Sequence, residues 1–128
     1  MSLPSTFRSA SATVRGLFTS GLSTQAGTVT MIDDEASFSA ITKDPKSVVL
    51  FTAGWCAPCK KVAPVYEELS AKHNGTTFAK VDIDTHDALA VSQGIRAIPS
   101  FQLFSEGKLM KEIMGADMMA LEDALRKA

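Results

Sequence analysis

The fold of this chain is decided by one stretch, SVVLFTAGWCAPCKK, which occupies residues 47–61. Its first half is an apolar run rich in β-branched and aromatic residues, which predicts a buried strand over residues 48–53. Gly54 ends the run, and apolar residues then recur at helical spacing. The stretch therefore predicts a strand that turns directly into a helix, with Cys56 in the first helical turn and Cys59 one turn further along.

Two cysteines at the start of a helix suit thiol–disulfide exchange. Unpaired backbone amides and the helix dipole favour a thiolate at this position, and cysteines in Cys-x-x-Cys motifs have pKa values lowered to about 3.5–7.5. A thiolate on Cys56 would attack a target disulfide, and Cys59 would then displace the product by an intramolecular attack. Pro58 is compatible with the first turn, where its missing N–H has no helical partner in any case.

Other roles for the cysteine pair fit the sequence less well. A zinc site would need more ligands, but the chain has only 2 cysteines, and the spacing from His73 to His86 is too long for a finger. A structural disulfide across so short a loop would restrict little of the unfolded chain. Inert buried thiols do not fit a strand-to-helix turn flanked by Trp55. The sequence therefore favours redox chemistry and predicts no metal and no cofactor.

Two motifs carry a resemblance to the thioredoxin family. Residues 55–60, WCAPCK, resemble the family's active site, and residues 94–101, GIRAIPSF, resemble the segment that carries its cis-proline. The resemblance covers roughly residues 28–127, and the two motifs at this spacing make it specific. Further matches are the sequence KVDID at residues 80–84, Gly107 and Gly115. The segment Phe51-Thr52-Ala53 and the N-terminal residues are most similar to plant mitochondrial, o-type thioredoxins.

The resemblance implies an α/β thioredoxin fold, with a central mixed sheet of about five strands flanked by four helices. The hydrophobic periodicity independently gives the order βαβαβαββα, which requires a layered α/β domain. Local signals predict Asp33 as the N-cap of the first helix and Asp84 or Thr85 as that of the third. They also predict that Gly75 closes the active-site helix in a left-handed conformation.

The function that the resemblance implies is reduction of protein disulfides in an organelle, which maintains its redox homeostasis. Cys56 would be the nucleophile and Cys59 the resolving thiol. An NADPH-dependent thioredoxin reductase would recharge the pair. The surface that receives disulfide-containing proteins would be apolar and flat, formed by Trp55, Ala57, Pro58, Ile98, Pro99 and Gly115. As the cis-proline, Pro99 would leave the backbone of Ile98 free to pair with an extended substrate strand.

Two departures from the family pattern concern this site. Ala57 replaces the usual Gly, which removes backbone freedom at the tip of the motif. Leu50 stands where most thioredoxins have a buried Asp that serves as the acid–base group for the second cysteine. Lys80, the usual partner of that Asp, would then extend toward solvent or favour a nearby thiolate.

Two other functions remain open on the sequence alone. One is a disulfide oxidant or isomerase of a secretory compartment, against which the Ala57-Pro58 pair and the absence of a signal peptide argue. The other is a redox-silent adaptor with the same fold, against which the two intact cysteines argue. A reduction potential near −270 mV would identify a thioredoxin, and one near −180 to −120 mV an oxidant.

The N-terminal segment differs in composition from the rest of the chain. Residues 1–27 contain Arg8 and Arg15, several serines and no acidic residue, a composition typical of organelle transit peptides. We interpret them as a mitochondrial transit peptide or a disordered extension, with a mature start near Gln25, and residues 28–128 as the thioredoxin domain. The predicted location is the mitochondrial matrix, or the cytoplasm if the segment is not a targeting signal.

The composition narrows the range of partners. The net charge is −1, and no basic patch is visible that would bind nucleic acid. No apolar run is long enough to span a bilayer. We therefore expect a monomer that binds neither nucleic acid nor membranes.

Overall fold

β2 (Ser47–Thr52) is the central strand of a five-stranded mixed sheet with the order β1-β3-β2-β4-β5. In this computed structural model, which describes residues 28–127, β1, β3 and β2 are parallel and β4 and β5 are antiparallel to their neighbours. The other elements are β1 (Val29–Met31), α1 (Glu35–Thr42), α2 (Ala57–Lys72), β3 (Thr77–Asp82), α3 (Asp87–Ser92), β4 (Ser100–Ser105), β5 (Lys108–Met114) and α4 (Met118–Lys127). This order is the one that the sequence predicted.

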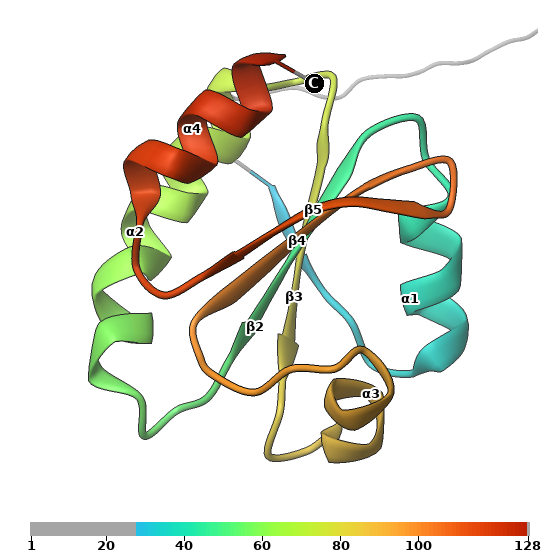
Figure 1. Ribbon diagram of the computed structural model, residues 1–128, viewed down its shortest axis with the longest axis vertical. Helices are drawn as coiled ribbons and strands as arrows, with labels where there is room; N and C mark the ends of the chain where they lie inside the picture. Colours follow the sequence, from blue (N-terminus) through green and yellow to red (C-terminus); the bar gives the residue numbers. More distant parts are fainter. Residues whose placement is uncertain (1–27, 128) are drawn as a thin grey trace, which may run out of the picture.

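The helices cover both faces of the sheet, α2 and α4 one face and α1 and α3 the other (Figure 1). Because side chains alternate along a strand, β2 supplies both cores. Val48 and Leu50 pack against α2 and α4, whereas Val49 and Phe51 pack against α1 and α3. A strand buried on both faces reads as a continuous apolar run, which is why residues 48–53 were recognisable from sequence.

Tyr66 of α2 fastens that helix to the sheet. Its ring lies in the core between α2 and the sheet, and its hydroxyl lies 2.7 Å from the carbonyl oxygen of Ala79 and 3.0 Å from that of Val48. Burial raises the pKa of Tyr66 well above its ordinary value, since a phenolate there would lose its water. The helix that begins at the cysteine motif is therefore held to the central strand β2 and to its neighbour β3.

Three of the local predictions are corrected by the structure. The N-cap of α1 is Asp34, not Asp33, because the Asp34 carboxylate accepts from the Ser37 amide at 2.8 Å in a capping box. The residue before α3 is His86, and its side chain makes no capping hydrogen bond. Gly75 does not take a left-handed backbone conformation. The helix α2 already ends at His73, whose backbone angles are non-helical.

The β4–β5 hairpin turns through Glu106 and Gly107. Both have positive φ, 53° and 87°, and Ser105 pairs directly with Lys108. Positive φ at both central residues is the geometry of a type I′ turn, whose twist matches that of the flanking strands. The sequence SEGK at residues 105–108 predicts a tight hairpin turn, and the structure confirms it. Among residues 28–127, no helix has the length and apolarity to cross a bilayer.

Candidate active site

Cys56 and Cys59 lie where β2 passes into α2. This junction of the two elements is at the lower end of the molecule in Figure 1. Cys56 is the N-cap of α2, with extended backbone angles (φ −89°, ψ 110°), and Cys59 lies within the first turn. The two are joined by a disulfide, with their Cα atoms 5.2 Å apart. Their exposed fractions are only 4% and 2%, so a partner must approach the pair closely to react with it.

The start of α2 provides a positive electrostatic environment for sulfur. The backbone N–H of Cys59 donates to Sγ of Cys56 over 3.2 Å, which takes the place of an ordinary capping hydrogen bond. No acidic residue occupies the first turn of the helix, and Lys60 and Lys61 follow the motif. A thiolate on Cys56 would gain both this hydrogen bond and the favourable end of the helix dipole.

The second predicted motif lies directly against the cysteines. Ile98 packs on the small cluster formed by Ala53, Cys56 and Cys59, and the peptide bond between Ile98 and Pro99 is cis. Pro99 is fully buried, while Ile98 is half-buried. Segments that are distant in sequence are therefore adjacent at one end of the sheet.

Gly115 lies beside Pro99 at this end of the sheet. Its N–H donates to the carbonyl oxygen of Pro99 over 2.7 Å. Its φ of 93° is in the left-handed region, which favours glycine. The structure thus brings Gly115 to the proline segment, as the sequence comparison with the family implied.

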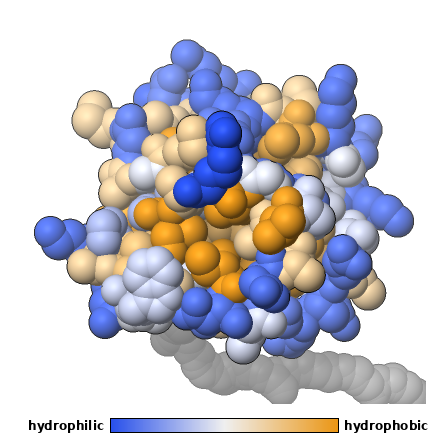
Figure 2. Space-filling view, turned by 60° about the horizontal axis from the view of Figure 1, so that its bottom comes forward, coloured by the Kyte–Doolittle hydropathy of each residue, from blue (hydrophilic) through white to orange (hydrophobic). Residues whose placement is uncertain are grey.

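The exposed part of this end is apolar. Ala57 and Pro58 are exposed, and Trp55 is exposed over 68% of its surface. The indole Nε1–H of Trp55 donates to Oδ1 of Asp84 over 3.2 Å. Figure 2, which looks at this end, shows apolar residues gathered at the centre with hydrophilic residues around them. A contiguous apolar area of this kind is typical of an interaction surface.

Leu50 lies in the core between the sheet and helices α2 and α4, with an exposed fraction of 2%. Its neighbour in register on β3 is Lys80, which is half-buried. Lys80 forms no ion pair in the part of the chain that the structure describes. The position that carries a carboxylate in most of the family is therefore an aliphatic core position in this chain.

Two residues of this region were missed as site residues on sequence. The sequence predicts Asp84 only as a possible helix cap, and its contact with Trp55 spans 29 positions, so no local pattern signals it. Gln102 lies in the apolar run of β4 and is fully buried. A lone amide within an apolar strand was the available signal for it.

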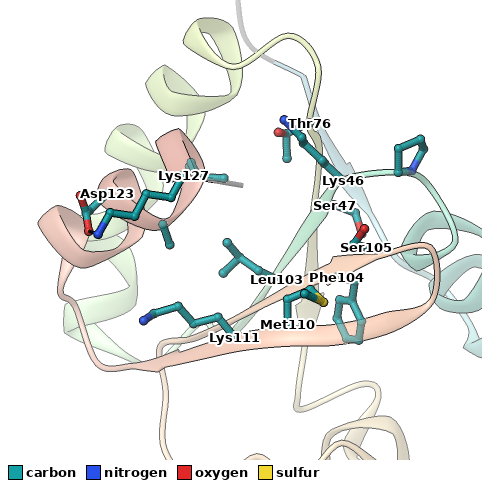
Figure 3. Close-up of a pocket in the computed structure, with 13 residues that line it drawn as sticks. Lys46, Ser47, Thr76, Leu103, Phe104, Ser105, Met110, Lys111, Asp123 and Lys127 are labelled. Atoms are coloured by element: carbon teal, nitrogen blue, oxygen red, sulfur yellow. Dashed lines mark ion pairs between the residues drawn. The ribbon is translucent and has the colours of Figure 1, made fainter.

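A pocket of about 440 Å³ lies at the opposite end of the sheet. As Figure 3 shows, it opens between the end of α4, β5 and the start of β2, with Leu103 near its middle. Asp123 and Lys127 form an ion pair of 3.1 Å at its rim. None of its lining residues belongs to the disulfide or to the proline segment, so it is separate from the redox site.

Comparison with known proteins agrees with this geometry. The family model described as Thioredoxin matches residues 28–127. Thioredoxin-1 of Schizosaccharomyces pombe is 38% identical over 99 residues, covering 77% of this chain and 96% of that protein. The chloroplastic F-type thioredoxin of Pisum sativum is 37% identical and covers 94% of this chain and 70% of its own length.

A solved structure gives the same result for the fold. The oxidised form of mitochondrial thioredoxin 3 from Saccharomyces cerevisiae superposes with a TM-score of 0.75 at 31% identity, covering 78% of this chain and 95% of the other. The predicted thioredoxin fold is therefore confirmed. Since the family model spans the described domain and the Cys56–Cys59 pair lies at disulfide distance, this chain belongs to the thioredoxin family of dithiol–disulfide oxidoreductases, which reduce protein disulfides.

Proposed function

We propose that Cys56 is the nucleophile and Cys59 the resolving thiol of this reductase. The observation that carries this assignment is the hydrogen bond from the Cys59 N–H to Sγ of Cys56. Hydrogen bonds to the charged form of a group favour that form, and the thiolate is the attacking species. Only Cys56 has its sulfur at the N-cap, where such a donor is available.

The reaction then proceeds in two exchanges. The Cys56 thiolate attacks one sulfur of a substrate disulfide, forms a mixed disulfide and releases the other sulfur as a thiolate, which takes up a proton. Cys59 loses its proton and attacks Sγ of Cys56, which forms the Cys56–Cys59 bond and releases the second substrate thiol. The substrate gains two electrons and the protein loses two.

The proposed substrate surface consists of Trp55, Ala57, Pro58, Ile98, Pro99 and Gly115. Its support is the adjacency of Ile98 to the cysteine cluster and of Gly115 to Pro99. An extended segment of a substrate protein would pair with the backbone at Ile98, which adds a strand-like contact beside the attacking sulfur. The exposed apolar side chains of Trp55, Ala57 and Pro58 would contribute affinity by losing contact with water.

The proposed setting is the mitochondrial matrix, where the protein acts as a monomeric, o-type-like thioredoxin recharged by an NADPH-dependent thioredoxin reductase. The support is the acid-free composition of residues 1–27, with Arg8 and Arg15. Those residues lie outside the described part of the chain. The likeness to a yeast mitochondrial thioredoxin is consistent with this setting.

The function is tested by trapping. Full-length Cys59→Ser, expressed with its N-terminal segment, should retain disulfide-linked partners through Cys56, and these should be mitochondrial proteins. The matched control, Cys56→Ser, should retain none. Partners trapped on the Cys56→Ser variant instead would reverse the assignment of the two sulfurs.

The location is tested separately by fusing residues 1–27 to a reporter protein. Import into isolated mitochondria is expected, and it should be lost when Arg8 and Arg15 are both replaced by Glu. Import into chloroplasts alone, or no import at all, would contradict the mitochondrial proposal without affecting the redox roles.

A further inference from the structure

Gln102 is the most unusual residue of the sheet interior. It lies in the middle of β4, in register with Val49 of β2 and Glu112 of β5, and none of its surface is exposed. Its amide faces the side of the sheet that α1 and α3 cover, because it reaches Gln93 at the end of α3. The core there is otherwise built mainly from aliphatic and aromatic side chains.

The amide has a defined orientation. Nε2 of Gln102 donates to the carbonyl oxygen of Gln93 over 3.1 Å and to Oε2 of Glu112 over 3.0 Å. Both partners are acceptors, so the NH₂ group must face them, and an exchanged amide would place its oxygen against two oxygens. The bond to the side chain of Glu112 fixes which way the amide faces, and so the direction of the bond to Gln93.

Stability alone does not account for this residue. Oε1 of Gln102 is buried and has no hydrogen-bond partner among the described residues. A buried acceptor left unpaired is unfavourable. An aliphatic side chain would bury no unpaired oxygen of its own, but it would leave the Gln93 carbonyl oxygen without this donor.

The hydrogen bond from the Gln102 amide to Gln93 closes a loop of the chain. Gln93 and Gln102 flank the segment that carries Ile98 and Pro99, so the Gln102–Gln93 bond joins its two ends. Within the segment, the hydroxyl of Ser100 donates to the carbonyl oxygen of Ala97 over 2.6 Å. Both hydrogen bonds run from a side chain of β4, after the cis peptide, to a backbone carbonyl oxygen before it, so they attach the segment to the sheet.

We infer that Gln102 is a positioning residue for substrate binding. Through its hydrogen bond to Gln93, it holds the Ile98–Pro99 segment in place beside Cys56. Glu112 acts through Gln102 by orienting its amide. This inference rests on the proposed role of Ile98 and Pro99 in docking protein substrates. A segment held in place before binding loses less conformational freedom when a substrate strand pairs with it.

The test uses the full chain, reduced beforehand with dithiothreitol, in single-turnover reactions followed by Trp55 fluorescence. Gln102→Met keeps the length and removes both hydrogen bonds. We expect the half-saturating concentration of insulin, a protein disulfide substrate, to rise about three- to tenfold, the factor that one hydrogen bond is worth. The rate with the small disulfide 5,5′-dithiobis(2-nitrobenzoate) and the alkylation rate of Cys56 should stay unchanged, since neither needs the segment.

Variants of Glu112 provide a second, surface-based test that does not disturb the core. Glu112→Ala should weaken insulin binding in the same direction, while Glu112→Gln, which keeps an acceptor oxygen, should restore it. Adding Glu112→Ala to Gln102→Met should have no further effect. Amide hydrogen exchange should also quicken at Ile95 and Gly115, but not at Phe51 in the centre of the sheet.

Two results would overturn the inference. One is wild-type insulin binding by Gln102→Met or, if that variant does not fold, by Glu112→Ala. The other is an equal loss of rate with insulin and with the small disulfide, which would indicate a structural role only. Ile98→Glu is the reference variant: wild-type insulin reduction by it would refute the docking surface itself, whereas a slow Ile98→Glu beside a normal Gln102→Met would refute only the role of Gln102.

Discussion

The backbone N–H of Cys59 lies 3.2 Å from Sγ of Cys56 and donates a hydrogen bond to it. One residue of the redox pair therefore supplies the group that stabilises the thiolate of the other. The relationship is asymmetric: among the described residues, no backbone N–H donates to the sulfur of Cys59, which lies within the first turn of α2. It predicts that the two cysteines differ in reactivity although they are only three positions apart.

The first prediction is that Cys56 is alkylated faster than Cys59. At pH 7, iodoacetamide should label reduced Cys59→Ser at least about tenfold faster than reduced Cys56→Ser, since a lowered thiol pKa increases the thiolate fraction. The measurement is the second-order labelling rate by mass spectrometry. Equal rates in the two variants would show that the N-cap hydrogen bond does not control the pair.

The second prediction concerns Leu50, which is 2% exposed beside Lys80. Leu50→Asp should lower the free energy of unfolding at pH 7 by about 1–3 kcal/mol, the scale for burying an imperfectly paired polar group. Burial would raise the folded-state pKa of the new carboxyl, so the part of the cost that comes from ionisation should be absent below about pH 4 and grow as the pH rises. Lys80 would reduce the rise in pKa. Urea unfolding of both proteins between pH 4 and 8 measures this.

The same variant tests the chemistry of Cys59. The family resemblance implies that a carboxylate at position 50 accepts the proton of Cys59, so the mixed disulfide should resolve faster in Leu50→Asp than in the natural chain. Leu50→Asn is the matched control, since it is polar but not a base. If the mixed disulfide resolves at the same rate in all three proteins, the residue at position 50 does not affect the deprotonation of Cys59.

The third prediction concerns Tyr66, whose hydroxyl lies 2.7 Å from the Ala79 carbonyl oxygen. Tyr66→Phe should lower the free energy of unfolding by about 0.5–1.5 kcal/mol at pH 8. Burial raises the pKa of Tyr66 above its ordinary value of 10.0. The tyrosine's contribution is therefore present below about pH 10 and is lost as the pH rises further, because only the unfolded state ionises readily. The urea midpoints of the two proteins should differ at pH 8 and be closer together at pH 10.5. A difference that is the same at both pH values would contradict this reasoning.

The fourth prediction concerns Asp84, which accepts from the Trp55 indole over 3.2 Å. Asp84→Ala should slow insulin reduction severalfold by freeing the exposed indole, while Asp84→Asn should be close to wild type because its carbonyl oxygen still accepts. Both residues are exposed, so stability should change by less than about 0.5 kcal/mol. If Asp84→Asn is as slow as Asp84→Ala, the negative charge matters and the hydrogen bond does not.

The fifth prediction concerns the hairpin turn, where Glu106 has a φ of 53°. Glu106→Asn should raise the free energy of unfolding by about 0.5–1 kcal/mol, because asparagine tolerates the left-handed conformation and Asn-Gly is the preferred type I′ pair. Glu106→Ala removes the same charge without relieving the backbone. A thermal melt that ranks alanine at or above asparagine would attribute any gain to charge.

The helix boundaries show where local sequence signals stop being reliable. Asp33 and Asp34 are both good N-cap residues, and the choice of Asp34 depends on Ser37 lying at the position that completes the capping box. Gly75 has the composition of a left-handed helix end, but the chain already leaves the helix at His73. A pattern identifies the element, and the backbone path on either side sets its last residue.

The sequence alone determined the strand-to-helix turn, the order of the elements and the identity of the redox pair. These depend on local periodicity and on the spacing of two residues, which the chain carries with it whatever it packs against. It also predicted the hairpin, since Glu106-Gly107 between two apolar runs is a local signal.

Only the tertiary structure decided which distant groups meet at the site. Three interactions join separate elements. They are the hydrogen bond from Trp55 to Asp84, the contact of Ile98 with the cysteines, and the hydrogen bond from Gln102 to Gln93. Each depends on the order of strands in the sheet, and that order is set by the long-range burial of side chains on both faces of β2. Long-range contacts of this kind leave no period in the sequence, so their partners are fixed only when the chain is folded.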